Sequence, residues 1–139
     1  DVPYWYYSSL VDMARDVDIL MVATPGGEGT HHIVTAEVIK ALGPKGLIVN
    51  IARGSIIDEP AMVKALKDGT LGGAALDVFE FEPKMPEELH KMDNVVLMPH
   101  RGGGTYETWE DACDMVRDNI FAYLKTGKPL TPIAETPID

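Results

Sequence analysis

Four short runs of apolar residues recur along the chain. They cover 18–23, 47–51, 73–79 and 95–98. Each run is apolar at consecutive positions rather than at alternating ones, which is typical of parallel strands that are buried on both faces. We therefore expect these runs to form the strands of a parallel sheet.

Helical patterns separate the runs. Four side chains that commonly cap helices, Ser9, Thr35, Asp58 and Thr105, each precede a segment of helical character. They predict helices over about 9–16, 36–42, 59–68 and 106–126, with Gly43, Gly69 and Gly127 near the ends of the last three. A short helix fits between the last two strands. The alternation predicts an α/β fold: part of a doubly wound, Rossmann-like parallel sheet with a long C-terminal helix.

Composition narrows the classes of function. The 139 residues carry 12 Lys and Arg against 22 Asp and Glu, a net charge of −10, which argues against a nucleic-acid partner. A lone Cys113 excludes an internal disulfide framework, and no apolar run reaches the ~18 residues of a membrane span. We expect a cytoplasmic protein that has no membrane segment.

Candidate chemistry lies just after the strands, because ligands of an open parallel sheet bind beyond the carboxyl ends of its strands. Arg53 offers a planar fork that matches a carboxylate, and His100 can carry a proton near neutral pH. Glu82 beside His100 would favour the protonated ring and orient it. Each residue alone is commonly part of a structural turn. Together they suit reduction of a 2-oxo acid by hydride from a bound cofactor, with Arg53 binding the acid and His100 protonating the carbonyl oxygen.

Three sequence blocks also carry a family resemblance. Residues 50–59 (NIARGSIIDE), 72–83 (GGAALDVFEFEP) and 94–105 (NVVLMPHRGGGT) resemble signature blocks of the D-isomer-specific 2-hydroxyacid dehydrogenases, and are most similar to hydroxypyruvate and glyoxylate reductases. The resemblance implies a catalytic set of Arg53, Glu82 and His100. It also implies that NAD or NADP lies against Pro25, Ile51, Ala52, Arg53, Asp77, His100, Gly102 and Gly103. Related formate dehydrogenases have Gln in place of Glu82 and are disfavoured.

The resemblance further implies an incomplete enzyme. The family's Gly-x-Gly-x-x-Gly turn is not found, and the run 26–29 (GGEG) lacks that spacing and is typical of a plain loop. We expect 1–104 to be the C-terminal portion of the dinucleotide-binding domain, lacking its first strands. We expect 105–139 to be a helix and tail that return to a substrate domain outside this chain, so that the apolar face of the helix is exposed in this chain alone. The order 3-2-1-4-5-6 then leaves a gap for the missing strands between 18–23 and 47–51.

Alternative functions stay open at this point. Certain transcriptional corepressors resemble the same family, so an NAD(H)-sensing binding protein without catalysis is one alternative to an oxidoreductase that acts on hydroxypyruvate or glyoxylate. A methyltransferase-like domain would need a glycine-rich turn after its first strand. The family also suggests a homodimer. Arg101 stands where the family usually has an apolar residue, and it either tunes the substrate pocket or points to solvent.

Other reactive residues have ordinary structural interpretations. The adjacent His31 and His32 have no third ligand at a local spacing and are interpreted as a solvated loop, as is His90. We predict no metal site. Cys113 is interpreted as a small buried residue of the long helix. Glu80 is less suited than Glu82 to the catalytic role, because the family's catalytic carboxylate stands directly before a proline.

Overall fold

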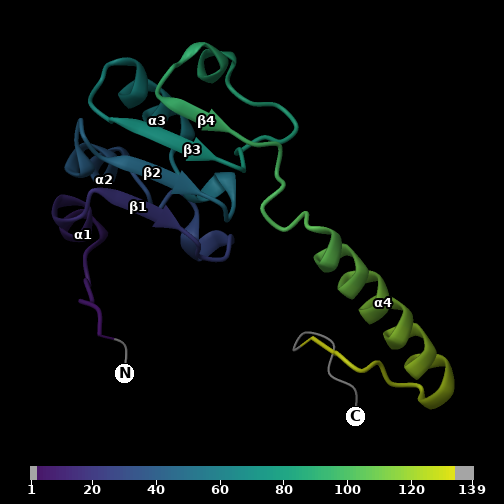
Figure 1. Cartoon of the computed structure of the whole chain (residues 1–139). Coiled ribbons are helices and arrows are strands. Elements are labelled where there is room, and N and C mark those ends of the chain that lie inside the picture. The colour runs from purple at the N-terminus through teal and green to yellow at the C-terminus, as the bar shows by residue number, and fades with distance from the viewer. Residues whose placement is uncertain (1–2, 134–139) are drawn as a thin grey trace. The chain divides into compact units, whose positions relative to one another are not determined.

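The structure, a computed structural model, describes residues 3–133. A single parallel sheet in the order β1-β2-β3-β4 forms its centre (Figure 1). The strands are β1 (Ile19–Val22), β2 (Leu47–Asn50), β3 (Gly73–Leu76) and β4 (Val95–Leu97). Every strand lies within one of the apolar runs identified in the sequence. The predicted parallel α/β fold is therefore confirmed.

The order of the strands corrects one expectation. β1 pairs directly with β2, with Ile19 opposite Leu47 and Val22 opposite Asn50, so no gap lies between them. The expectation treated 18–23 as an outer strand on the far side of the missing ones. The run β1-β2-β3-β4 instead extends the 4-5-6 side of the doubly wound order, in which successive strands are neighbours. β1 is an edge strand of the described sheet, since it pairs with β2 on one side only.

Local capping explains where the helices begin. The helices are α1 (Leu10–Asp16), α2 (Ala36–Leu42), α3 (Glu59–Lys67) and α4 (Tyr106–Thr126), with shorter turns of 3-10 helix η1 (Glu28–Thr30), η2 (Gly54–Ile56) and η3 (Glu87–Lys91). The predicted caps Ser9, Thr35, Asp58 and Thr105 each accept a hydrogen bond from a backbone amide three residues later. Each cap satisfies an amide that the first helical turn leaves without a partner.

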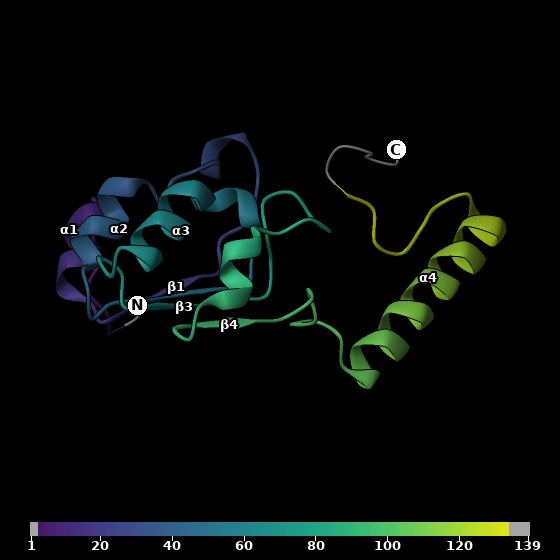
Figure 2. The ribbon, with the colours of Figure 1, turned by 90° about the horizontal axis from the view of Figure 1, so that it is seen from above.

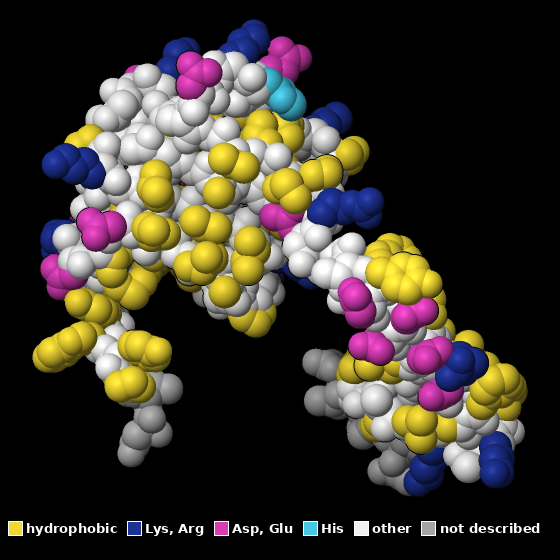
Figure 3. Space-filling view, viewed as in Figure 1, with side chains coloured by type: hydrophobic (Ala, Val, Ile, Leu, Met, Phe, Trp, Pro, Cys, Tyr) yellow, Lys and Arg dark blue, Asp and Glu magenta, His cyan; other side chains and the backbone are white. Residues whose placement is uncertain are grey.

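One face of the sheet carries the hydrophobic core. α1, α2 and α3 lie together on that face, with α1 packed on α2 and α2 on α3 (Figure 2). Alternate strand residues such as Leu20, Ile48 and Leu76 point into this layer and are buried. Within residues 3–100, no element covers the opposite face. It presents Ile19, Met21, Leu47, Val96 and Met98 to solvent (Figure 3). The apolar runs predicted burial on both faces, and residues 3–100 supply the cover for only one.

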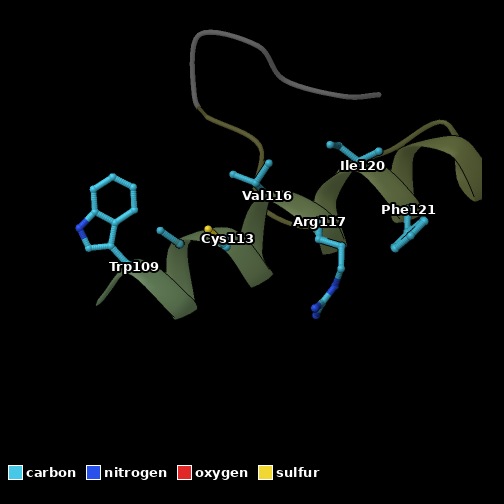
Figure 4. A pocket seen from close by; sticks show the side chains of 7 residues that line it. Trp109, Cys113, Val116, Arg117, Ile120 and Phe121 are labelled. Atoms are coloured by element: carbon cyan, nitrogen blue, oxygen red, sulfur yellow. The ribbon is translucent and has the colours of Figure 1, made fainter. Parts of the chain in front are cut away.

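The chain divides into two compact units between His100 and Arg101. In the second unit, α4 has no buried residue, so the expected exposure of its apolar face is observed. An open, mostly apolar groove of about 500 Å³ runs along it between Trp109 and Phe121 (Figure 4). Cys113 lies in this groove and is exposed, so the prediction that it is buried was wrong. Helical periodicity identified an apolar face, but the described part of the second unit itself packs nothing over it.

The segment after α4 is anchored by one side chain. Oδ1 of Asn119 accepts hydrogen bonds from the backbone amides of Leu130 and Thr131. The segment therefore turns back along the helix within the second unit. Among residues 3–133, no helix combines the length and the apolar character needed to cross a bilayer.

Candidate active site

The turn that follows β2 presents Arg53. Asn50, the last residue of β2, is buried; its Oδ1 accepts from the amide of Ala52 at 3.0 Å and its Nδ2 donates to the carbonyl of Arg53 at 2.9 Å. These two bonds fix the backbone of the turn and leave the Arg53 side chain at the surface. Sequence reasoning gave Asn50 no role. The available signal was an Asn at the end of a buried strand, where its amide can bond to the backbone of the following turn.

Close packing joins this turn to the loop that follows β3. A Cβ placed on Gly54 would lie 1.9 Å from the carbonyl carbon of Phe79 and 2.3 Å from the amide nitrogen of Glu80. Only glycine allows this contact between two backbones. Arg53, directly before Gly54, is thereby held close to the loop that carries Glu80 and Glu82.

His100 and Glu82 form the predicted hydrogen-bonded pair. Nδ1 of His100 donates to Oε2 of Glu82 at 2.8 Å, and Oε1 of the same carboxylate accepts from the amide of Phe79 at 2.9 Å. Both oxygens of Glu82 are therefore engaged, which fixes the carboxylate and through it the imidazole ring. Nε2 of His100, on the opposite side of the ring, is the atom that can face a ligand.

Electrostatics and backbone geometry mark this pair. The hydrogen bond from His100 is the main cause that lowers the pKa of Glu82; partial burial opposes it, while the Phe79 amide and the charges of His100 and Arg53 reinforce it. Glu82 is thus an anion beside the imidazole at neutral pH. His100 itself has φ +54°, a conformation uncommon for a residue with a side chain, and one that clusters at functional sites.

Two hollows lie at the carboxyl ends of the strands. One, of about 420 Å³, is lined by Phe79, Glu82, Pro83, Met85, Pro99 and His100. The other, of about 360 Å³, is lined by Ala23, Thr24, Pro25, Gly26, Ala52 and Arg53. The structure therefore places Glu82 and His100 in one hollow and Arg53 in the other. The Arg53 charge in the second hollow nevertheless contributes to the lowered pKa of Glu82 in the first.

Apart from His100, the predicted cofactor residues lie in three places. Pro25, Ala52 and Arg53 line the second hollow, and Ile51, beside them in sequence, is exposed although it is apolar. Asp77 is buried at the end of β3, where its carbonyl accepts from the amide of His100 at 2.8 Å. Gly102 and Gly103 belong to the second unit, where they are exposed in the turn before α4, as is Arg101.

Comparison with known proteins identifies the family. The model of the NAD-binding domain of D-isomer specific 2-hydroxyacid dehydrogenases matches residues 2–102. The chain belongs to this family. Its Rossmann-like fold is that of an NAD-binding domain, and the cofactor class is NAD or NADP.

Relatives of the chain include named reductases. It is 52% identical over 133 residues to glyoxylate/hydroxypyruvate reductase A of Arabidopsis thaliana, and 53% identical over 131 residues to hydroxyphenylpyruvate reductase of Plectranthus scutellarioides. These alignments cover 96% and 94% of this chain and 42% of each relative. The chain thus spans less than half of the length of these relatives.

A solved structure with a bound cofactor is also similar. The NADPH-dependent glyoxylate/hydroxypyruvate reductase of Sinorhizobium meliloti, in complex with NADP and malonate, is 48% identical and superposes with a TM-score of 0.92. The match covers 98% of this chain and 43% of that one. The exposed apolar Ile51 beside the hollow at Ala52 and Pro25 fits the flat face of a nicotinamide ring, so the residues present suit that half of the cofactor.

Proposed function

We propose that this chain is the catalytic part of an NAD(P)-dependent D-2-hydroxyacid dehydrogenase that reduces a small 2-oxo acid such as hydroxypyruvate or glyoxylate. The observation that carries the proposal is the His100 ring, which Glu82 holds through Nδ1 so that Nε2 is available to a substrate. The reductase names of the relatives support it, and they do not favour an NAD(H)-sensing protein without catalysis.

Three side chains have separate roles in the reduction of the 2-oxo acid. The Arg53 guanidinium binds the substrate carboxylate and orients the adjacent carbonyl. Nε2 of His100 donates its proton to the carbonyl oxygen as the carbonyl carbon is reduced. Glu82 is a positioning residue that holds the ring and favours its protonated form. The nicotinamide, when bound against Ile51 and Ala52, supplies the hydride. In the reverse direction, His100 takes the proton of the hydroxyl group.

The remaining assignments belong to the same proposal. We propose that 1–104 forms the C-terminal portion of the cofactor domain and that 105–139 returns to a substrate domain, which the exposed apolar groove of α4 supports. We further propose a cytoplasmic homodimer. The exposed thiol of Cys113 suits a reducing compartment. Light scattering of the whole enzyme tests the dimer, and fractionation of cells that express it tests the location.

Kinetics of the whole enzyme containing this chain test the catalytic roles. Hydroxypyruvate and glyoxylate are offered with NADPH and with NADH. We expect His100→Ala to lower kcat by about 10²- to 10⁴-fold with the affinity for NADPH little changed, since a proton donor acts in the transition state. Arg53→Ala should also raise KM for the 2-oxo acid, since it binds the ground state too.

His90→Ala is the matched control for these kinetic measurements. His90→Ala removes an exposed histidine outside both hollows and should leave kcat within about twofold of the parent, as is usual for surface substitutions. The assignment is wrong if His100→Ala and Arg53→Ala lose NADPH binding to the same extent, because both residues would then be structural.

A further inference from the structure

A second histidine cluster lies on the loops that follow β1 and β3. Nε2 of His32 donates to Oε1 of Glu80 at 2.8 Å, and Nε2 of His31 lies 3.8 Å from the same oxygen. The two imidazole rings are stacked with centroids 3.9 Å apart. The potential ligand atoms of His31, His32 and Glu80 all lie within 4.8 Å of one another. The sequence contained no third ligand near His31 and His32, and the fold supplies one from 48 residues away.

The backbone fixes this cluster. The amide of His32 donates to the carbonyl of Ser55 at 2.8 Å, and the hydroxyl of Thr30 donates to the carbonyl of Pro25 at 2.8 Å. His32 has φ +51°, and this backbone conformation is part of the turn that stacks its ring on that of His31. The sequence suggested that these imidazoles lie on a freely solvated loop. The structure shows instead that backbone hydrogen bonds fix the loop that carries them.

Burial in the cluster increases toward the carboxylate. The side chain of His31 is 56% exposed, that of His32 is 33% exposed and that of Glu80 is only 10% exposed. The Glu80 backbone is held in turn, because its amide donates to Oε2 of the buried Glu59 at 3.1 Å. A cation can therefore reach the cluster from solvent past His31 and meet a carboxylate whose loop is already anchored.

The geometry points to a binding site for one divalent transition-metal ion, which we propose is held by Nε2 of His31, Nε2 of His32 and a carboxylate oxygen of Glu80. Two imidazoles and a carboxylate form a ligand set that suits Zn²⁺, with a fourth position left for water. Tetrahedral Zn²⁺ with bonds of about 2.0–2.1 Å sets its ligand atoms about 3.3 Å apart.

Small movements bring the two pairs that involve Glu80 to that spacing, and the third pair, His31 and His32, lies within 4.8 Å. The His32–Glu80 pair opens slightly from 2.8 Å, and the His31–Glu80 pair closes slightly from 3.8 Å. A metal-bound Nε2 carries no hydrogen, so the bond from His32 to the metal replaces its hydrogen bond to Glu80. Mg²⁺ prefers oxygen ligands in octahedral geometry and is excluded by this set.

Calorimetry on the whole enzyme tests the site. The protein is untagged and stripped with EDTA, and it is titrated with ZnCl₂ and with MgCl₂. We expect a Zn²⁺-binding event that His31→Gln, His32→Gln and Glu80→Gln each weaken by about tenfold or more, as loss of metal ligands does. The matched control is His90→Gln, which should retain the parent's affinity within about twofold. Mg²⁺ should give no corresponding event.

His31→Gln keeps the test decisive if the other two variants fold poorly, because more than half of the His31 side chain is exposed and it packs little. Zn²⁺ should raise the Tm of the parent and of His90→Gln, and it should raise that of His31→Gln much less at the same concentration. Equal Zn²⁺ affinity of the parent and His31→Gln would overturn the proposal. So would an equal loss in His90→Gln.

Discussion

Two histidine–glutamate pairs follow the carboxyl ends of the strands, and both are joined at 2.8 Å. His100 uses Nδ1 to bond Glu82, whereas His32 uses Nε2 to bond Glu80. Both histidines have positive φ, +54° and +51°. The pairs differ in access, since the carboxylate side chain is 35% exposed in the first and 10% exposed in the second.

The choice of ring nitrogen separates what the two pairs can do. A ring tied through Nδ1 turns Nε2 toward a ligand, so His100 is suited to exchange a proton with a substrate. A ring whose Nε2 already faces a neighbouring carboxylate and a second imidazole is suited to share a cation with them. The two pairs therefore support different chemistry, although each joins a histidine to a glutamate at the same distance.

Measuring both kcat and Zn²⁺ affinity on a variant of each pair tests whether the two pairs act separately. We expect His100→Ala to lower kcat by about 10²- to 10⁴-fold and to leave Zn²⁺ affinity within about twofold. His32→Ala should weaken Zn²⁺ binding by about tenfold or more and lower the kcat of the metal-free enzyme far less than His100→Ala does. Steady-state kinetics and calorimetry on the same preparations measure both. If His32→Ala costs as much kcat as His100→Ala, the two pairs serve a single function.

A glycine substitution probes the scaffold that both pairs share. Gly54→Ala would drive a Cβ into the backbone at Phe79 and Glu80, which leads into both carboxylates. We expect it to lower the free energy of unfolding by about 3 kcal/mol, at the upper end for overpacking, and to impair kcat and Zn²⁺ binding together. Denaturant titration measures the stability.

Gly29→Ala is the control for that substitution, because its Cβ meets nothing within 4 Å. It should change the free energy of unfolding by no more than about 0.5 kcal/mol. Equal stability of the two alanine variants would show that the contact between Gly54 and the loop after β3 is not rigid.

The smallest expected effect is a pH dependence at Glu82. Its pKa is lowered from the ordinary 4.5, first by the hydrogen bond from His100, so its ionised form stabilises the fold. That contribution is fully present above pH 4.5 and is lost as the pH falls through the lowered value. The difference in Tm between the parent and Glu82→Gln, measured with EDTA present, should therefore shrink toward acid pH. A difference that stays constant would contradict the lowered pKa.

Local chemistry made most of the fold predictable. Ser9, Thr35, Asp58 and Thr105 identified helix starts because each cap acts within three residues of itself. The neighbour of β1 was predicted wrongly, because the run 18–23 was placed in the half of the doubly wound order that lies beyond the missing strands. The apolar side of α4 was predictable, whereas the exposure of Cys113 was not, since periodicity does not say whether anything covers a helix.

Part of the candidate site was also predictable from the sequence. Position after a strand, together with the family resemblance, indicated His100 and Glu82, and the hydrogen bond between them is present. Asn50 and Gly54 were missed because they act on the backbone rather than on a ligand, Asn50 within its own turn and Gly54 against the loop after β3. Glu80, the third member of the histidine cluster, was missed because the search for ligands considered only residues close in sequence. The fold of the sheet brings Glu80 to the two histidines from a distant part of the chain.

The edge strand β1 and the uncovered face beside it favour association between copies of the isolated chain. β1 lies at the edge of the sheet, and the exposed Ile19 and Met21 stand beside its unpaired backbone groups. Such an edge is a template for pairing with another strand. The net charge of −10 keeps copies of the chain apart at low ionic strength, and salt screens that repulsion. Turbidity of concentrated solutions of the isolated chain should therefore rise as salt is added.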